Sequence, residues 1–260
     1  MKRSIHSLIL CCVTVLLATG CAIPSVDVAP RYGIMNLDGT YGLENADSAG
    51  DPTVAPADLS TAGLDTDNGY IGAKIELDLG VPVFTLSTQS TKHGGDGTLS
   101  ATVGAIFVTS PVATNLDLGL HTLLLTWDVV PTDYVDIGIG LGATVIDLDA
   151  SIAGAGEEET ADETIPVPVL GIRARVELGD FRFSALLSGM SLDLGSDKAN
   201  FYDIDVLAEY HLFGGDDRLG GSIGLGYRST VLDFEYEDGG DSIDVEVDLN
   251  GPYVAMVFSF

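Results

Sequence analysis

Hydrophobic and polar residues alternate with a period of two along most of the chain after residue 68. The segment 134–149 shows this most clearly, because aliphatic side chains from Val135 to Val145 occupy every second position and Gly, Thr or Asp stands between them. Successive side chains of a β-strand point to opposite sides of the sheet. Such a segment is therefore expected to form a strand with one aliphatic face and one small or polar face. The same alternation recurs over 69–79, 164–178 and 201–213.

An aliphatic face opposite a small or polar face is typical of a barrel wall that separates lipid from a narrow lumen. No stretch after residue 21 has the roughly 18 uninterrupted apolar residues of a transmembrane helix. Only helices and closed barrels satisfy every backbone polar group in lipid. We therefore predict an all-β fold, a transmembrane antiparallel up-and-down β-barrel.

The connections between the expected strands alternate between short and long. Outer-membrane barrels have short periplasmic turns and longer outer loops. If the weakly patterned segment 31–42 is the first strand, the barrel has ten strands and both termini are periplasmic; without it, eight is the alternative. We favour ten. The short turns are 80–82, 131–133, 179–180 and 214–217, and the longer connections are 43–68, 91–114, 150–163, 195–200 and 237–242.

The N-terminal residues 1–20 resemble a signal peptide. Lys2 and Arg3 precede an apolar run over 8–18, which is too short for a membrane-spanning helix. The run ends in small residues before Cys21, as in bacterial lipoproteins, so we predict that Cys21 is lipidated and is the first mature residue. Ala18 stands where Leu is usual, and ordinary cleavage nearby is the alternative. Residues 21–30 would then form a spacer before a barrel over 31–260.

The C-terminal segment has the pattern of a final barrel strand. Val254, Met256, Phe258 and Phe260 share one face, and Tyr253 precedes them. This resembles the C-terminal strand recognised by the barrel-assembly machinery, so we take Tyr253, Phe258 and Phe260 as an assembly signal. The alternative is a soluble β-sandwich that ends in Phe.

The chain is strongly acidic, with a formal net charge of −28. This charge disfavours nucleic acid as a partner, because phosphate backbones require Lys and Arg. The acidic segments 157–163 and 233–241 could bind divalent cations or bridge them to lipopolysaccharide phosphates. The alternative is a solvated surface that steers cations. All three cysteines lie within residues 1–21, so the rest of the chain has no cysteine for a disulfide or a metal site. We predict no cofactor and no metal site.

Charged residues gather on the face of the expected strands opposite the aliphatic one. Unpaired charge in a confined lumen is costly, so opposite charges should pair there. A barrel of eight to ten strands has little interior beyond its own side chains, which favours a salt-bridged plug over a selectivity lining for a pore. The predicted lumen charge cluster is Lys74, Glu76, Arg173, Arg175, Glu177, Arg182, Glu209 and Arg228.

The sequence carries no recognisable catalytic motif. The histidines after the signal segment are His93 in a Gly-rich connection, His121 within a strand, and His211 near a short turn. A nucleophile needs a base within hydrogen-bond reach, and a single sequence does not reveal such a pair. We therefore expect that the protein is not an enzyme.

Several short motifs resemble a family of small bacterial outer-membrane β-barrels without an assigned activity. The resemblance covers about residues 63–260 and does not extend confidently to 31–42. It implies a barrel in the outer membrane, in contact with lipid and lipopolysaccharide, and brings no catalytic residues. The motifs are 63–70 (GLDTDNGY), 114–118 (TNLDL), 224–228 (GLGYR) and 250–254 (NGPYV) before the final FSF.

These observations favour a non-enzymatic barrel with a structural role in the envelope or in surface interaction. A small pore for ions or solutes is the first alternative. A lipid-modifying enzyme acting at the rim of the barrel is the second.

Overall fold

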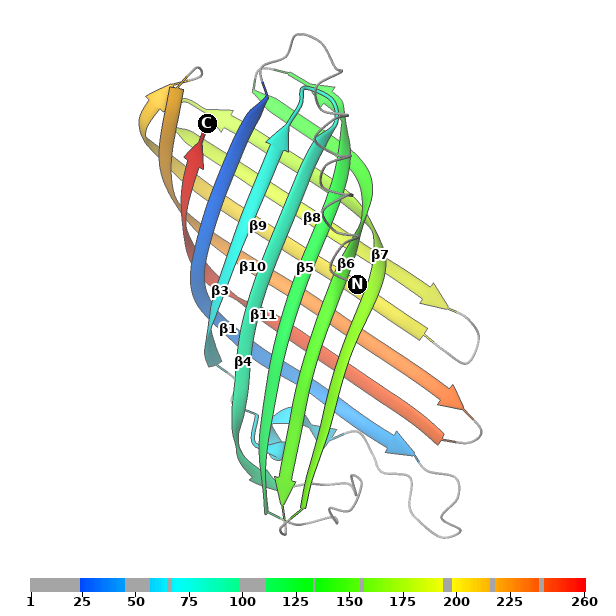
Figure 1. The fold of residues 1–260 in the computed structure, drawn as a ribbon. Coiled ribbons are helices and arrows are strands. Elements are labelled where there is room, and N and C mark those ends of the chain that lie inside the picture. The colour runs from blue at the N-terminus through cyan, green and yellow to red at the C-terminus, as the bar shows by residue number, and fades with distance from the viewer. Residues whose placement is uncertain are drawn as a thin grey trace, which may run out of the picture.

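Long antiparallel strands form one closed barrel in the computed structural model (Figure 1). The structure describes residues 24–44, 57–64, 67–98, 111–132, 134–154, 157–193, 198–215, 218–238 and 241–260. The wall consists of β1 (Ser25–Glu44), β3 (Asp67–Asp78), β4 (Val83–Thr98), β5 (Pro111–Pro131), β6 (Val135–Gly154), β7 (Glu157–Leu178), β8 (Phe181–Asp193), β9 (Lys198–Gly215), β10 (Arg218–Asp238) and β11 (Asp241–Ser259).

The barrel closes because β11 pairs with β1, from Asp27–Ser259 to Glu44–Ser242. Every other wall strand pairs with its neighbours in the chain. The prediction of an antiparallel up-and-down barrel with ten wall strands is confirmed for the part of the chain that the structure describes. Among these residues, no helix is long and apolar enough to cross a membrane.

The two ends of the barrel differ in their connections. At one end, which we call the turn end, β3 is followed by β4, β5 by β6, β7 by β8 and β9 by β10, and Ser25 and Phe260 lie there too. This end is uppermost in Figure 1, where the C-terminus is marked. We call the opposite end the loop end. The half of the barrel next to each end is named after it.

A short segment packs against the apolar core at the loop end. It comprises β2 (Ala57–Asp58), which pairs with β1, and the 3-10 turn η1 (Leu59–Ala62). Thr114 on β5 donates a hydrogen bond to the carbonyl oxygen of Ala62, at 2.7 Å. Gly63 has a φ of +87°, and a Cβ there would lie 2.4 Å from the backbone carbon of Asp96. Only glycine fits this close crossing of the segment over β4.

The apolar side chains change from the outer face of the wall to the inner face about half-way along the barrel, as β5 illustrates. We call this change the reversal of polarity. In the turn half, Leu123 and Trp127 are exposed on the outside, whereas Thr126 faces the lumen. In the loop half, Asn115 is exposed outside and Leu116 is buried inside. The outer aliphatic and aromatic side chains of the turn half form a continuous band, the apolar belt. Its members include Ile34, Ile71, Leu86, Leu123, Trp127, Ile139, Leu141, Leu170, Ile172, Phe183, Ile204, Leu225, Val254 and Met256.

The reversal explains where the strand predictions were wrong. In the loop half, polar residues point outward and the inward residues are often small, so those segments resemble loops in the sequence. Half or more of each predicted connection at 91–114, 150–163, 195–200 and 237–242 lies within strands, since β4 runs to Thr98 and β7 begins at Glu157. The first strand begins at Ser25 and not at residue 31, so most of the predicted spacer belongs to the wall. The predicted signal peptide and Cys21 lie outside the described residues.

Candidate functional site

Charged side chains fill the lumen in the turn half, and Glu76 lies at the centre of them. Glu76 is buried and forms an ion pair with Arg175. Lys74 and Arg173 each place a nitrogen 3.8 Å from a Glu76 carboxylate oxygen. Three cations from β3 and β7 therefore surround one carboxylate, and Arg173 and Arg175 have further acidic partners.

Arg173 is held by two carboxylates from neighbouring strands. It pairs with Asp128 on β5 and, at 2.6 Å, with Asp136 on β6. Asp128 lies at a bulge in β5, where the register against β6 shifts between Asp128 and Val130. Such an irregularity re-aims side chains locally.

Arg182 on β8 connects the network to the barrel seam. It lies 3.2 Å from Asp27 on β1, 3.0 Å from Glu177 on β7 and 4.0 Å from Glu209 on β9. Asp27 also lies 3.8 Å from Arg175. The two pairs made by Asp27 join β1 to β7 and β8, which are not its neighbours in the wall, so they brace the barrel across its lumen.

A second charged cluster lies nearer the middle of the barrel. Arg228 on β10 makes two parallel contacts to Asp203 on β9, at 2.8 and 2.9 Å, and a third to Ser87 at 3.2 Å. Arg31 lies 2.5 Å from Asp205 and 4.7 Å from the centre of the Tyr253 ring.

The Tyr253 hydroxyl donates a hydrogen bond to Asp205. Its ring meets that of Tyr70 edge to face, with the ring centres 6.1 Å apart. Both tyrosines are buried beside the Arg31–Asp205 pair.

An apolar core occupies the lumen mainly in the loop half, and some of its members, such as Leu124 and Leu186, lie at the level of the charged clusters. The succession is visible along β9, where Phe201 belongs to this core, Asp203 and Asp205 follow, and Glu209 is next to the turn end. The core is built from inward side chains of most wall strands and from η1. Its buried members are Leu37, Leu64, Leu116, Leu118, Leu120, Leu124, Ile146, Val167, Val169, Leu186, Phe201, Leu232 and Leu249.

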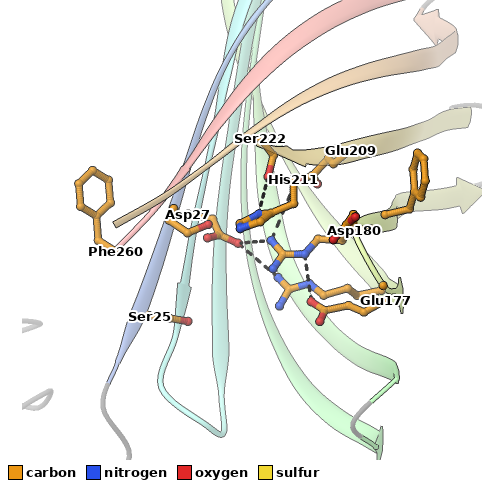
Figure 2. Close-up of a pocket in the computed structure, with 14 residues that line it drawn as sticks. Ser25, Asp27, Glu177, Asp180, Glu209, His211, Ser222 and Phe260 are labelled. Atoms are coloured by element: carbon orange, nitrogen blue, oxygen red, sulfur yellow. Dashed lines mark hydrogen bonds and ion pairs between the residues drawn. The ribbon is translucent and has the colours of Figure 1, made fainter. Parts of the chain in front are cut away.

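A cavity of about 290 Å³ opens at the turn end (Figure 2). Arg175, Arg182 and Glu209 line its inner part, and His211 contacts Ser222 at 3.3 Å near its rim. Phe260 points away from these side chains in Figure 2. Behind the cavity, among the same charged residues, lies a space of only about 10 Å³, no more than one water molecule requires. The cavity therefore narrows sharply among these charged side chains.

The structure places all eight residues of the predicted lumen cluster on the interior face. Seven of them belong to the network around Glu76 and Arg182, whereas Arg228 belongs to the cluster with Asp203. The sequence analysis missed Asp27, Arg31 and Asp128. Asp27 lay in the predicted spacer, and Arg31 lacked a clear alternating context. The bulge begins after Asp128, which keeps the period of two, but an apolar residue also stands at the inward position 124, so the sequence does not separate the two faces there.

The remaining predicted sites also have positions in the structure. Phe258 and Phe260 are exposed on the outer face, whereas Tyr253 points into the lumen. Glu158 and Asp162 of the acidic segment 157–163 are exposed on β7, and the side chains of 235–241 lie outside the described set. Within the described residues, no group of three or more His, Cys, Asp or Glu is arranged to hold a metal ion.

Comparison with known proteins gives the fold. No family model and no curated protein sequence matches the chain. Among solved structures, the outer-membrane protease OmpT from Escherichia coli is similar with a TM-score of 0.56 and 12% identity, over 90% of this chain and 97% of OmpT. This is the fold of an outer-membrane β-barrel.

Two further barrels match with lower TM-scores. Ail, the attachment invasion locus protein of Yersinia pestis, has a TM-score of 0.40 and 11% identity over 92% of this chain and 100% of its own. OprG from Pseudomonas aeruginosa has a TM-score of 0.39 and 13% identity over 93% and 98%.

Proposed function

We propose that the protein is a sealed barrel of the bacterial outer membrane, with a structural role in the envelope or a role in surface interaction. The apolar belt supports the membrane location, because exposed aliphatic and aromatic side chains surround the turn half of the barrel while its lumen is charged. In this proposal the belt lies in lipid. The turn end, with both described termini, faces the periplasm, as in other outer-membrane barrels with short periplasmic turns.

The succession of charged and apolar side chains along the lumen is the observation that supports the proposal. An ion entering from the turn end meets the network around Glu76, then the Arg228–Asp203 cluster, then the apolar core. Each charged residue named in these two clusters has an opposite charge within 4.0 Å, so the clusters present no unpaired ring to a permeating ion. The apolar core excludes ions because they would lose their hydration there.

The strands are longer than a bilayer requires, and the extra length provides a surface for interaction. β7 has 22 residues, whereas a strand that only crosses a bilayer needs about 9 to 11. The loop half therefore projects beyond the belt, with a polar outer face and its own apolar core. We propose that this projecting half contacts lipopolysaccharide and external partners, and that its acidic residues bind divalent cations only in the presence of such a partner.

Solute flux distinguishes this proposal from a small pore. Proteoliposomes containing the full chain are diluted into an isotonic solution of a small sugar, and swelling is followed by light scattering. We expect the swelling rate of protein-free liposomes. Swelling that increases with the amount of folded protein would support the pore instead.

A further inference from the structure

Thr88, His121 and Asp147 form a connected chain on the outer wall of the barrel. The Thr88 hydroxyl lies 2.7 Å from Nδ1 of His121, and Nε2 of His121 lies 3.4 Å from a carboxylate oxygen of Asp147. Thr164 donates a hydrogen bond to the other Asp147 oxygen, at 2.9 Å. Four neighbouring strands, β4 to β7, thus contribute one residue each.

The pairing of the strands fixes this arrangement. Thr88 is directly opposite His121, and Asp147 is directly opposite Thr164. Asp147 is diagonal to His121, because it pairs with Gly119. A Cβ at Gly119 would lie 3.4 Å from both His121 Nε2 and the Asp147 Cβ. A larger side chain at position 119 would therefore stand between the imidazole and the carboxylate.

The order of the groups sets the direction of proton transfer. An ionised Asp147 only accepts, so it favours the tautomer with a proton on Nε2 of His121. Nδ1 of the same ring is then an acceptor, and the Thr88 hydroxyl donates to it. A hydroxyl, an imidazole that removes its proton and a carboxylate that orients the imidazole are the three groups that acyl-transfer enzymes use, on several unrelated folds.

The position of the chain on the wall indicates its substrate. Toward the turn end, the neighbouring outward residues on β4 and β5 are Leu86 and Leu123 of the apolar belt. Toward the loop end, Lys92 and Asp117 form an exposed ion pair. His121 and Asp147 are about half-exposed at this boundary. In a bilayer, the boundary between hydrocarbon and headgroups is where the ester groups of lipids lie.

We propose that Thr88, His121 and Asp147 form a catalytic site for the hydrolysis of carboxylic esters of membrane amphiphiles. The Thr88 oxygen attacks the ester carbonyl carbon while its proton passes to His121. The bond to the alcohol oxygen breaks, and His121 returns the proton to the departing alcohol. Water then attacks the acyl-threonine, its proton passes through His121 to the Thr88 oxygen, and the carboxylic acid is released. The nearest outward hydroxyl on the same strand is Ser90.

This inference adds an activity on the outer wall and does not depend on whether the lumen is sealed. A detergent-micelle assay therefore separates the two proposals, because it needs neither a closed bilayer nor solute flux. The full chain in mixed micelles is given a fluorogenic medium-chain ester and, separately, an alkyl fluorophosphonate that traps activated hydroxyls. Retention of the barrel in each variant is checked by the heat-dependent shift in gel mobility.

We expect the wild-type protein to hydrolyse the ester and to carry one phosphonyl adduct, mapped to Thr88. T88V and H121Q should lower the rate by about 100-fold or to background, and D147N by about tenfold or more. D117N, which removes a carboxylate from the neighbouring level of the same face, should stay within about twofold of wild type, since Asp117 has no contact with the three residues. A folded wild-type protein that matches T88V in both assays would overturn the proposal, and so would an adduct on another residue.

Discussion

Arg228 and Asp203 form a two-point ion pair, at 2.8 and 2.9 Å, next to the apolar core of the lumen. Thr230 donates a further hydrogen bond to Asp203 at 2.8 Å. Both charged side chains are almost completely buried, so each relies on the other for the interactions it would otherwise have with water. The pair marks the transition from a charged to an apolar lumen.

Removing one partner of this pair should be more harmful than removing both. D203N or R228M leaves a buried charge without its partner, and we expect a loss of about 3–5 kcal/mol in the free energy of unfolding. The double variant R228M/D203L should recover most of that loss. Unfolding by guanidinium in detergent micelles measures all three. A loss in the double variant equal to the sum of the two single losses would show that the pair is not coupled.

Gly226 provides the space that Tyr253 occupies. A Cβ at Gly226 would lie 2.1 Å from the Tyr253 ring, whereas a Cβ at Gly69 would meet only the Tyr32 hydroxyl at 3.6 Å. We expect G226A to displace Tyr253 from Asp205 and to cost about 2 kcal/mol or more, through overpacking and the lost hydrogen bond.

The matched variant G69A should leave the free energy of unfolding unchanged within about 0.5 kcal/mol. Near-ultraviolet circular dichroism reports the environment of the tyrosines in both variants. A G226A protein with wild-type stability and spectrum would contradict the packing of Tyr253 described above.

The reversal of polarity can be tested within one strand. Leu120 is fully buried in the apolar core, whereas Leu123 is exposed in the belt three residues later on β5. L120A should cost about 2–5 kcal/mol in detergent, because it leaves a cavity. L123A should cost less than about 1 kcal/mol under the same conditions, because detergent fills the space. Similar losses for both variants would place Leu123 in a protein core.

The membrane boundary can be located on β7. Asp162 and Leu170 both point outward, one in the projecting loop half and one in the belt. In proteoliposomes, a membrane-impermeant maleimide should label D162C rapidly and leave L170C almost unlabelled, relative to the parent chain. Both cysteines should react after denaturation in SDS. Rapid labelling of L170C in the folded protein would show that the belt does not lie in the lipid.

The sequence alone was sufficient to predict the barrel and to predict that the charged side chains of the turn half face the lumen. In that half, Arg173 and Arg175 alternate with the aliphatic residues Leu170, Ile172 and Ala174, so the period of two separates the faces. The partners of these charges were beyond prediction. Arg175 pairs with Glu76, which is 99 residues away in the chain, and only the closure of the barrel brings the two together.

The apolar core of the loop half was missed for a different reason. Residues such as Leu116, Leu118 and Leu120 alternate with polar or small ones, as they would in either orientation. Alternation shows that a strand has one apolar and one polar face. Which of the two lines the lumen depends on whether the outer face meets lipid or water. The Thr88–His121–Asp147 chain likewise depends on the register of two strand pairs, β4–β5 and β5–β6, which the sequence does not reveal.

The sealed lumen is the central claim, and ion conductance across a planar lipid bilayer tests it most directly. The full chain, inserted at single-molecule density, should give no stable conductance steps above the bare bilayer at moderate voltage. R173Q/R175Q should lose stability and should also remain silent, because the apolar core still closes the lumen. A long-lived open channel in the wild-type protein, with an ion selectivity that R173Q/R175Q alters, would contradict the account.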